Sequence, residues 1–65
     1  MMQKLKILLP HWADHNTEHV RTYMEWAQKA ESAGADGLAL VLKEIADEGE
    51  RLTALFEKAK KMLEG

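Results

Sequence analysis

The 65-residue sequence contains no cysteine, so no disulfide can staple the fold. A chain of this length buries only about 60% of the surface that its unfolded form exposes, which makes a single core marginal. The remaining ways to stabilise such a chain are a bound metal, very regular helix packing, or self-association. We expect one small domain over residues 1–65 that associates with copies of itself.

The sequence also lacks an excess of charge of either sign and any long apolar run. Nine basic and eleven acidic residues give a formal charge of -2, so neither nucleic acid nor an anionic membrane surface is expected as a partner. No stretch approaches the roughly 18 apolar residues of a membrane span. The first nine residues are basic and apolar but are followed by no cleavage site, so we expect a soluble, cytoplasmic protein.

Proline and glycine are scarce, and their positions divide the chain into two predicted helices. Between Pro10 and Gly34 there is no further proline and no glycine. Apolar and small residues recur there at helical spacing, which predicts a helix over about residues 10–33. Its predicted buried face consists of Trp12, Asn16, Val20, Tyr23, Ala27 and Ala30. Gly34 is the residue expected just past a helix C-terminus, and Asp36 is a good N-cap for the next helix.

The second predicted helix, over about residues 37–64, has a sevenfold apolar repeat. Its stripe is three positions wide, which suits a helix that packs on more than one neighbour. The three columns are Leu38, Ile45, Leu52 and Ala59; Val41, Leu55 and Met62; and Leu42, Phe56 and Leu63.

Residues 2–9 fit both the alternation of a strand and the stripe of a helix, and we favour the helix. Pro10 complicates this segment because proline disfavours helical geometry at the residue before it. Either a short helix kinks at Pro10, or an extended arm ends there.

A short connection between two long helices makes them antiparallel, so the predicted fold is an all-α helical hairpin. Two helices alone do not cover a stripe as wide as the one over residues 37–64. We therefore expect a homodimer in which two hairpins form a four-helix bundle, with a larger homo-oligomer as the alternative.

Glu48 and Gly49 interrupt the stripe of the second helix. Folding the hairpin about residues 34–37 places Glu48 opposite Tyr23 and near His19. A simple interpretation is a hydrogen bond from Tyr23 to Glu48 with Gly49 as a notch for Trp26, since single polar residues often fix register. The functional interpretation adds a metal or a ligand to the same contacts.

All three histidines lie four residues apart, at His11, His15 and His19. Residues four apart on a helix lie on one face, and two neutral imidazoles at this spacing can bind one transition metal. Three cannot bind one ion from a straight helix, because His11 and His19 are about 12 Å apart along the axis. We expect His15 and His19 as ligands, completed by Glu18, Glu48 or a group from a second subunit.

The spacing does not select one metal, since imidazole pairs suit Zn, Ni, Cu or Fe. The sequence has neither the zinc-protease pattern nor the Glu-x-x-His repeats of di-iron bundles, so an enzyme of either type is not expected. A hydrogen-bonded structural cluster and a pH-sensitive site are the alternatives for the histidines.

The run His11-Trp12-x-x-His15-Asn16-x-Glu18-His19, followed by Tyr23 and Trp26-Ala27, resembles the signature of a family of short, uncharacterised helical-hairpin proteins and domains of anaerobic bacteria and archaea. The resemblance covers nearly the whole chain and is specific over residues 11–27. It implies an all-helical, dimeric unit with a metal or small-ligand site on His11, His15, Asn16, Glu18 and His19. No established activity accompanies it.

These observations predict a metal-binding helical bundle for sensing, storage or delivery. The alternative is a structural module, with no bound ligand, whose hairpins pair with themselves or with another helical protein. A weaker hypothesis is an enzyme that uses His19 and Glu48 as an acid–base pair.

Overall fold

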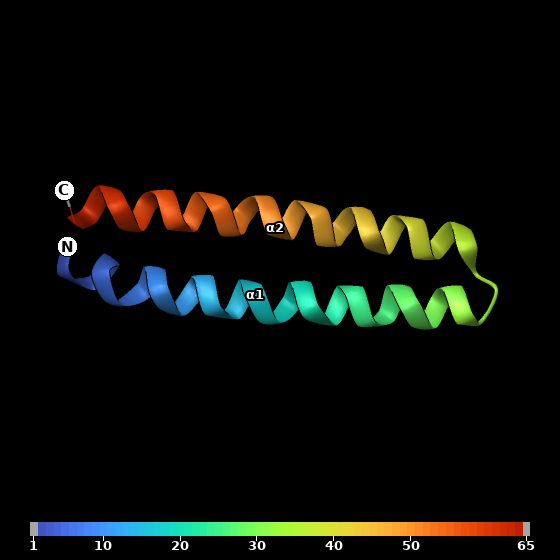
Figure 1. Ribbon diagram of the computed structural model, residues 1–65. Helices are drawn as coiled ribbons and strands as arrows, with labels where there is room; N and C mark the ends of the chain where they lie inside the picture. Colours follow the sequence, from blue (N-terminus) through green and yellow to red (C-terminus); the bar gives the residue numbers. More distant parts are fainter. Residues whose placement is uncertain (1, 65) are drawn as a thin grey trace.

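A computed structural model describes residues 2–64 as two long antiparallel helices joined by a short turn (Figure 1). Helix α1 spans Met2–Ser32 and helix α2 spans Asp36–Glu64. The described part of the chain is a rod of 48 × 14 × 13 Å and contains no strand. The predicted all-α hairpin is therefore confirmed, while positions 1 and 65 of the predicted domain lie outside the described residues.

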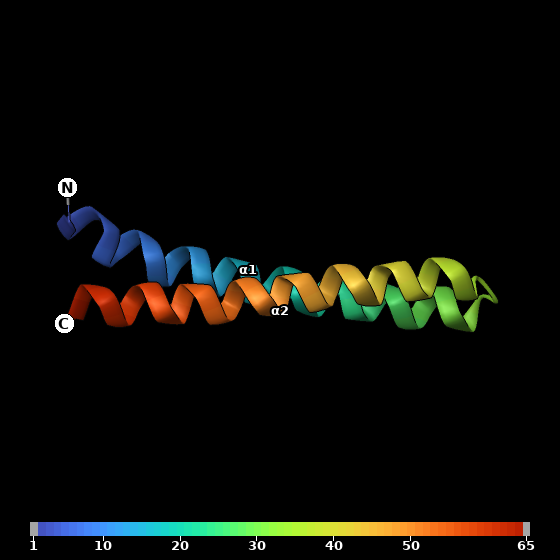
Figure 2. The same cartoon turned by 90° about the horizontal axis from the view of Figure 1, so that it is seen from above.

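Residues 2–9 are helical, as the favoured interpretation predicted, but they do not form a separate helix. Helix α1 continues through Pro10, which is the ninth residue of the helix. Because proline has no N–H, the helical hydrogen bond to the carbonyl of Lys6 is missing there. In Figure 2 the N-terminal turns of α1 run away from the axis of α2.

The turn is set by Gly34, which has a φ of 83°. The N–H of Gly34 donates to the carbonyl of Glu31 at 3.0 Å, and the N–H of Ala35 donates to that of Ala30 at 2.8 Å. This pair of bonds is a Schellman motif, which favours glycine because its left-handed conformation strains a side chain. The prediction of Gly34 beyond the helix end is confirmed.

Helix α2 begins at Asp36, about one residue earlier than predicted. The N–H of Ala39 donates to the carbonyl of Ala35 at 2.9 Å, so Ala35 occupies the N-cap position. The prediction of Asp36 as the N-cap was wrong. Its carboxylate lies instead in the first helical turn, where negative charge stabilises the helix dipole.

The contact between the helices is made mainly by small residues. The buried residues are Leu9, Ala13 and Ala27 of α1 and Ala39, Ala46 and Gly49 of α2. None of the described large side chains is fully buried. Small residues let two helices approach closely, but they bury little apolar area, so the hydrophobic stabilisation within one hairpin is small.

The predicted buried face of α1 is largely confirmed, with one correction. Ala27 is fully buried, and Tyr23 and Val20 are partly buried. Trp12 is 43% exposed, and its place in the interface is taken by Ala13. The two positions are about 100° apart on a helix, and only alanine fits the close contact with α2.

Candidate functional site

The three histidines form a row along the exposed surface of α1. The ring centroids of His15 and His19 are 4.4 Å apart, with the rings nearly perpendicular. Those of His11 and His15 are 6.4 Å apart and stacked. Because a Zn–N bond is about 2.0–2.1 Å long, imidazoles as close as His15 and His19 can reach one ion. The structure brings this pair together more closely than the other.

The row continues into the aromatic residues of α1. The ring of Tyr23 stacks on that of His19 with a centroid distance of 6.0 Å. Trp26 is 55% exposed, and the Nζ of Lys29 lies 4.3 Å from the centroid of its ring. The contact is a cation–π interaction. An exposed aromatic strip therefore follows the histidines along α1.

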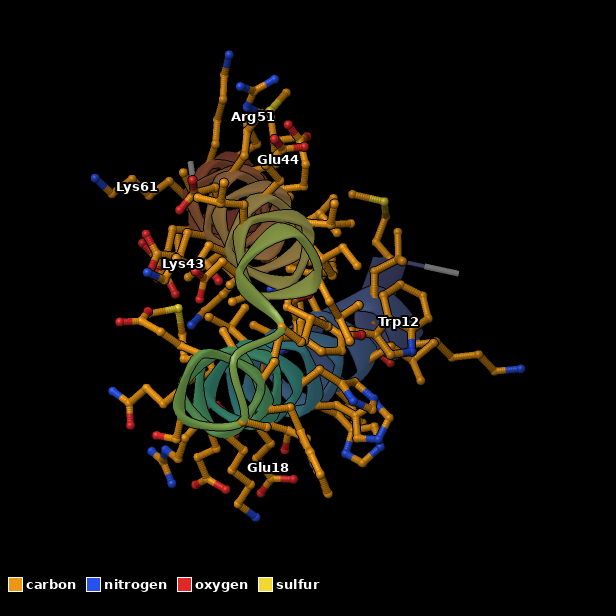
Figure 3. The ribbon with its side chains drawn as sticks, turned by 90° about the vertical axis from the view of Figure 1, so that its right-hand side faces the viewer. Trp12, Glu18, Lys43, Glu44, Arg51 and Lys61 are labelled. Atoms are coloured by element: carbon orange, nitrogen blue, oxygen red, sulfur yellow. The ribbon has the colours of Figure 1, made fainter. Side chains whose placement is uncertain are left out.

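The predicted carboxylate ligands do not join the histidines. No group of three His, Asp or Glu residues within residues 2–64 could hold a metal ion. Glu48 is 67% exposed and lies 3.7 Å from Arg51 on its own helix. Glu18 points away from α2, at the bottom of Figure 3. One chain therefore offers the two imidazoles but no third ligand beside them.

Gly49 does provide a notch, but Val20 fills it. A Cβ built on Gly49 would lie 2.5 Å from Cγ2 of Val20. The prediction that Trp26 would occupy this notch was wrong. The hairpin register places Val20 opposite Gly49, and the β-branched side chain is short enough to fit against the bare backbone.

Asn16 forms the polar contact between the helices that the sequence did not reveal. Its Nδ2 donates to the carbonyl oxygen of Gly49 at 2.8 Å and to Oγ1 of Thr53 at 2.9 Å. Oγ1 of Thr53 also donates to the carbonyl of Gly49 at 3.2 Å. A polar residue on a predicted buried face was the available signal, since such residues need partners. Asn16 is thus a register-fixing residue.

The aliphatic residues of α2 and the aromatic residues of α1 lie on the same side of the hairpin. In Figure 3, seen from the turn, Trp12 points to one side and Lys43 to the other. Ile45 follows Lys43 by about 200° of helical rotation, so it lies on the Trp12 side. Six aliphatic residues of α2 on this side are 42–75% exposed: Leu38, Val41, Ile45, Leu52, Leu55 and Met62. We call this side, with Trp12, His19, Tyr23 and Trp26, the apolar flank.

Comparison with known proteins identifies the family. Residues 5–63 match the family described as "Domain of unknown function (DUF8180)". The chain belongs to this family. An "Uncharacterized protein" of Archaeoglobus fulgidus is 37% identical over 62 residues, covering 95% of this chain and 98% of that protein. No solved structure matches. The expected membership of a family of small uncharacterised proteins is confirmed for this DUF8180 chain.

The length and hydropathy of the two helices were compared with those of a membrane-spanning helix. Within residues 2–64, neither helix has a segment that is both long and apolar enough to cross a bilayer.

Proposed function

We propose that this DUF8180 chain is a homodimeric helical hairpin that binds a divalent transition metal through His15 and His19. The observation that supports the proposal is the 4.4 Å separation of the two ring centroids on the exposed surface of α1. Neutral imidazole is a ligand for Zn, Ni, Cu or Fe, and an exposed pair suits an ion that is exchanged in sensing, storage or delivery. A cytoplasmic location remains a prediction.

Two imidazoles leave a metal ion with open coordination positions, since zinc sites usually have three or four protein ligands. The carboxylates predicted to complete the site, Glu18 and Glu48, form no group of three ligands with the histidine pair within residues 2–64. The further ligands therefore come from water or from a second chain.

Thermal unfolding of untagged protein with and without metal tests this proposal. A ligand present at a hundred times its Kd stabilises the folded state by about 2.7 kcal/mol. For a chain of this size the Tm then rises by roughly 10 °C or more. Zinc, nickel or copper should produce this rise, and the double variant His15→Ala with His19→Ala should lose it.

The control variant is His11→Ala, because His11 lies 6.4 Å from His15 and is not needed for the pair. This variant should keep most of the metal-dependent rise in Tm. No rise with any of the metals, in protein shown to be free of metal by elemental analysis, would refute metal binding.

The second candidate function is a structural module that pairs with itself or with another helical protein. The apolar flank favours it, because six aliphatic side chains of α2 and two tryptophans are exposed in the isolated hairpin. A hairpin with a core of small residues gains most of its further stability by covering such a surface. Self-association without a metal response would support this candidate over the first.

A further inference from the structure

The aromatic strip of α1 is symmetric about His19. Trp12 and Trp26 lie seven residues before and after it, and His15 and Tyr23 lie four before and after it. Seven residues are nearly two helical turns and four are just over one, so all five side chains share one face within about 80°. The separations of these residues from His19 are therefore the same toward the N-terminus and toward the C-terminus of the helix.

The aliphatic row of α2 has its centre at the same level. Leu38 and Met62 lie twelve residues either side of Glu50, and Ile45 and Leu55 lie five either side. Val20 faces Gly49 across the hairpin. Because the helices are antiparallel, one residue back along α1 from Val20 corresponds to one residue forward along α2 from Gly49. His19 and Glu50 therefore lie side by side along the rod. The centres of the two rows therefore coincide along the rod.

A two-fold axis perpendicular to the helices at this level would superpose the α1 row on itself. In α2 it would exchange Leu38 with Met62 and Ile45 with Leu55, while Leu52 would face Glu48. Trp12 of one chain would meet Trp26 of a second copy, and Leu38 would meet Met62. The two hairpins would lie with their turns at opposite ends, and each α1 would pack on the α1 of the other chain. In the other closed pairing the turns lie at the same end, and each α1 packs on the α2 of the other chain. The two aromatic rows then do not meet, so the symmetric spacing about His19 would play no part in the contact.

We propose that two chains pair through the apolar flank about this axis, with His19 of both chains meeting on it to bind one shared divalent metal ion. His15 of one chain, one turn away, supplies a third imidazole. A second copy is the occupant that fits, because it carries the same symmetric rows, and the core of one hairpin is too small to leave the flank uncovered. The metal part of this inference rests on the proposed function.

This arrangement explains why one chain holds an incomplete site. The described residues of one hairpin bring together two imidazoles and no third ligand. The two His19 rings and one His15 ring supply three imidazoles, which is the number of protein ligands in an open zinc site, whereas the two His15 rings lie about 12 Å apart along the rod and cannot both reach one ion. Metal binding then depends on the dimer, and the dimer is tightened by the metal.

Spin-label distances test the arrangement without relying on metal. The chain has no cysteine, so a single introduced cysteine is labelled alone. Ser32 lies thirteen residues from His19, so labels on Ser32→Cys should be about 40 Å apart in the dimer. Labels on the control Glu18→Cys, beside the axis, should be within about 25 Å of each other. Short distances at both positions, or a monomer, would overturn the arrangement.

Zinc titration followed by sedimentation equilibrium tests the shared ion. We expect one Zn²⁺ per dimer and a dissociation constant of the dimer at least ten-fold lower with zinc. His19→Ala should abolish both effects and His11→Ala should retain them, with helicity checked by circular dichroism. Two ions per dimer, or an unchanged response in His19→Ala, would overturn the shared site. Long Ser32 distances without any zinc binding would refute the proposed function but preserve the pairing.

Discussion

The side-chain amide of Asn16 lies 2.8 Å from the carbonyl oxygen of Gly49, a residue thirty-three positions further along the chain. Gly49 has no side chain between its backbone and α1, and Val20 lies in the space that a Cβ would fill. A sliding of one helix past the other would break the amide bond and also move Val20 out of the notch. These two contacts together fix the axial register of the hairpin.

Replacing Asn16 by alanine should lower the free energy of unfolding by about 1–2 kcal/mol. The substitution removes both hydrogen bonds to α2, and each contributes about 1 kcal/mol net. Urea unfolding at one fixed protein concentration measures the change, because dimer formation would also affect stability.

The matched control for Asn16 is Thr22→Ala. Thr22 is exposed and bonds only within α1, to the carbonyl of Glu18 at 3.1 Å. Its replacement should change the free energy of unfolding by less than about 0.5 kcal/mol. Equal losses in the free energy of unfolding for the two variants would show that the Asn16 hydrogen bonds between the helices contribute no more than a hydrogen bond within α1.

Replacing Gly49 by alanine should destabilise the hairpin by about 1 kcal/mol. Alanine is favoured over glycine in a helix by about 1 kcal/mol, but overpacking a tight contact costs typically 1–3 kcal/mol. The stiff Val20 side chain lies where the new methyl group would be. Thermal unfolding of the variant should therefore show a lower Tm.

Two further variants separate the contact from the effect of helix propensity. Gly37→Ala meets nothing within 4 Å and should stabilise α2 by about 0.5–1 kcal/mol. Combining Gly49→Ala with Val20→Ala should give a smaller loss than the sum of the single losses. A stabilised Gly49→Ala variant would contradict the close packing at this position.

A charge on the apolar flank should convert the protein to a monomer. Ile45→Lys places a charged group opposite Leu55 in the proposed interface, where burying it unpaired is costly. Leu40→Lys is the control, because Leu40 is 62% exposed but lies about 140° away from Ile45 around α2. Native mass measurements should show a dimer for the control and a monomer for Ile45→Lys. A monomeric parent protein would rule out both proposals that involve pairing.

The two helices, the turn between them and the closeness of the histidines could all be predicted from the order of the amino acids. Local physics decides these features: the spacing of apolar residues, the left-handed conformation that only Gly34 adopts without strain, and the one-turn separation of His15 and His19. None of them depends on which residue of α2 faces which residue of α1.

The features that depend on register and rotation between the helices could not be predicted, because they arise only when the two helices pack together. The tertiary structure placed Val20 in the Gly49 notch, paired Glu48 with Arg51 away from the histidines, and turned Trp12 outward in favour of Ala13. A shift of one residue rotates a helix by about 100°. The apolar periodicity of the sequence is compatible with more than one alignment of the two helices. The close contact of small residues and the Asn16 hydrogen bonds form in one alignment only.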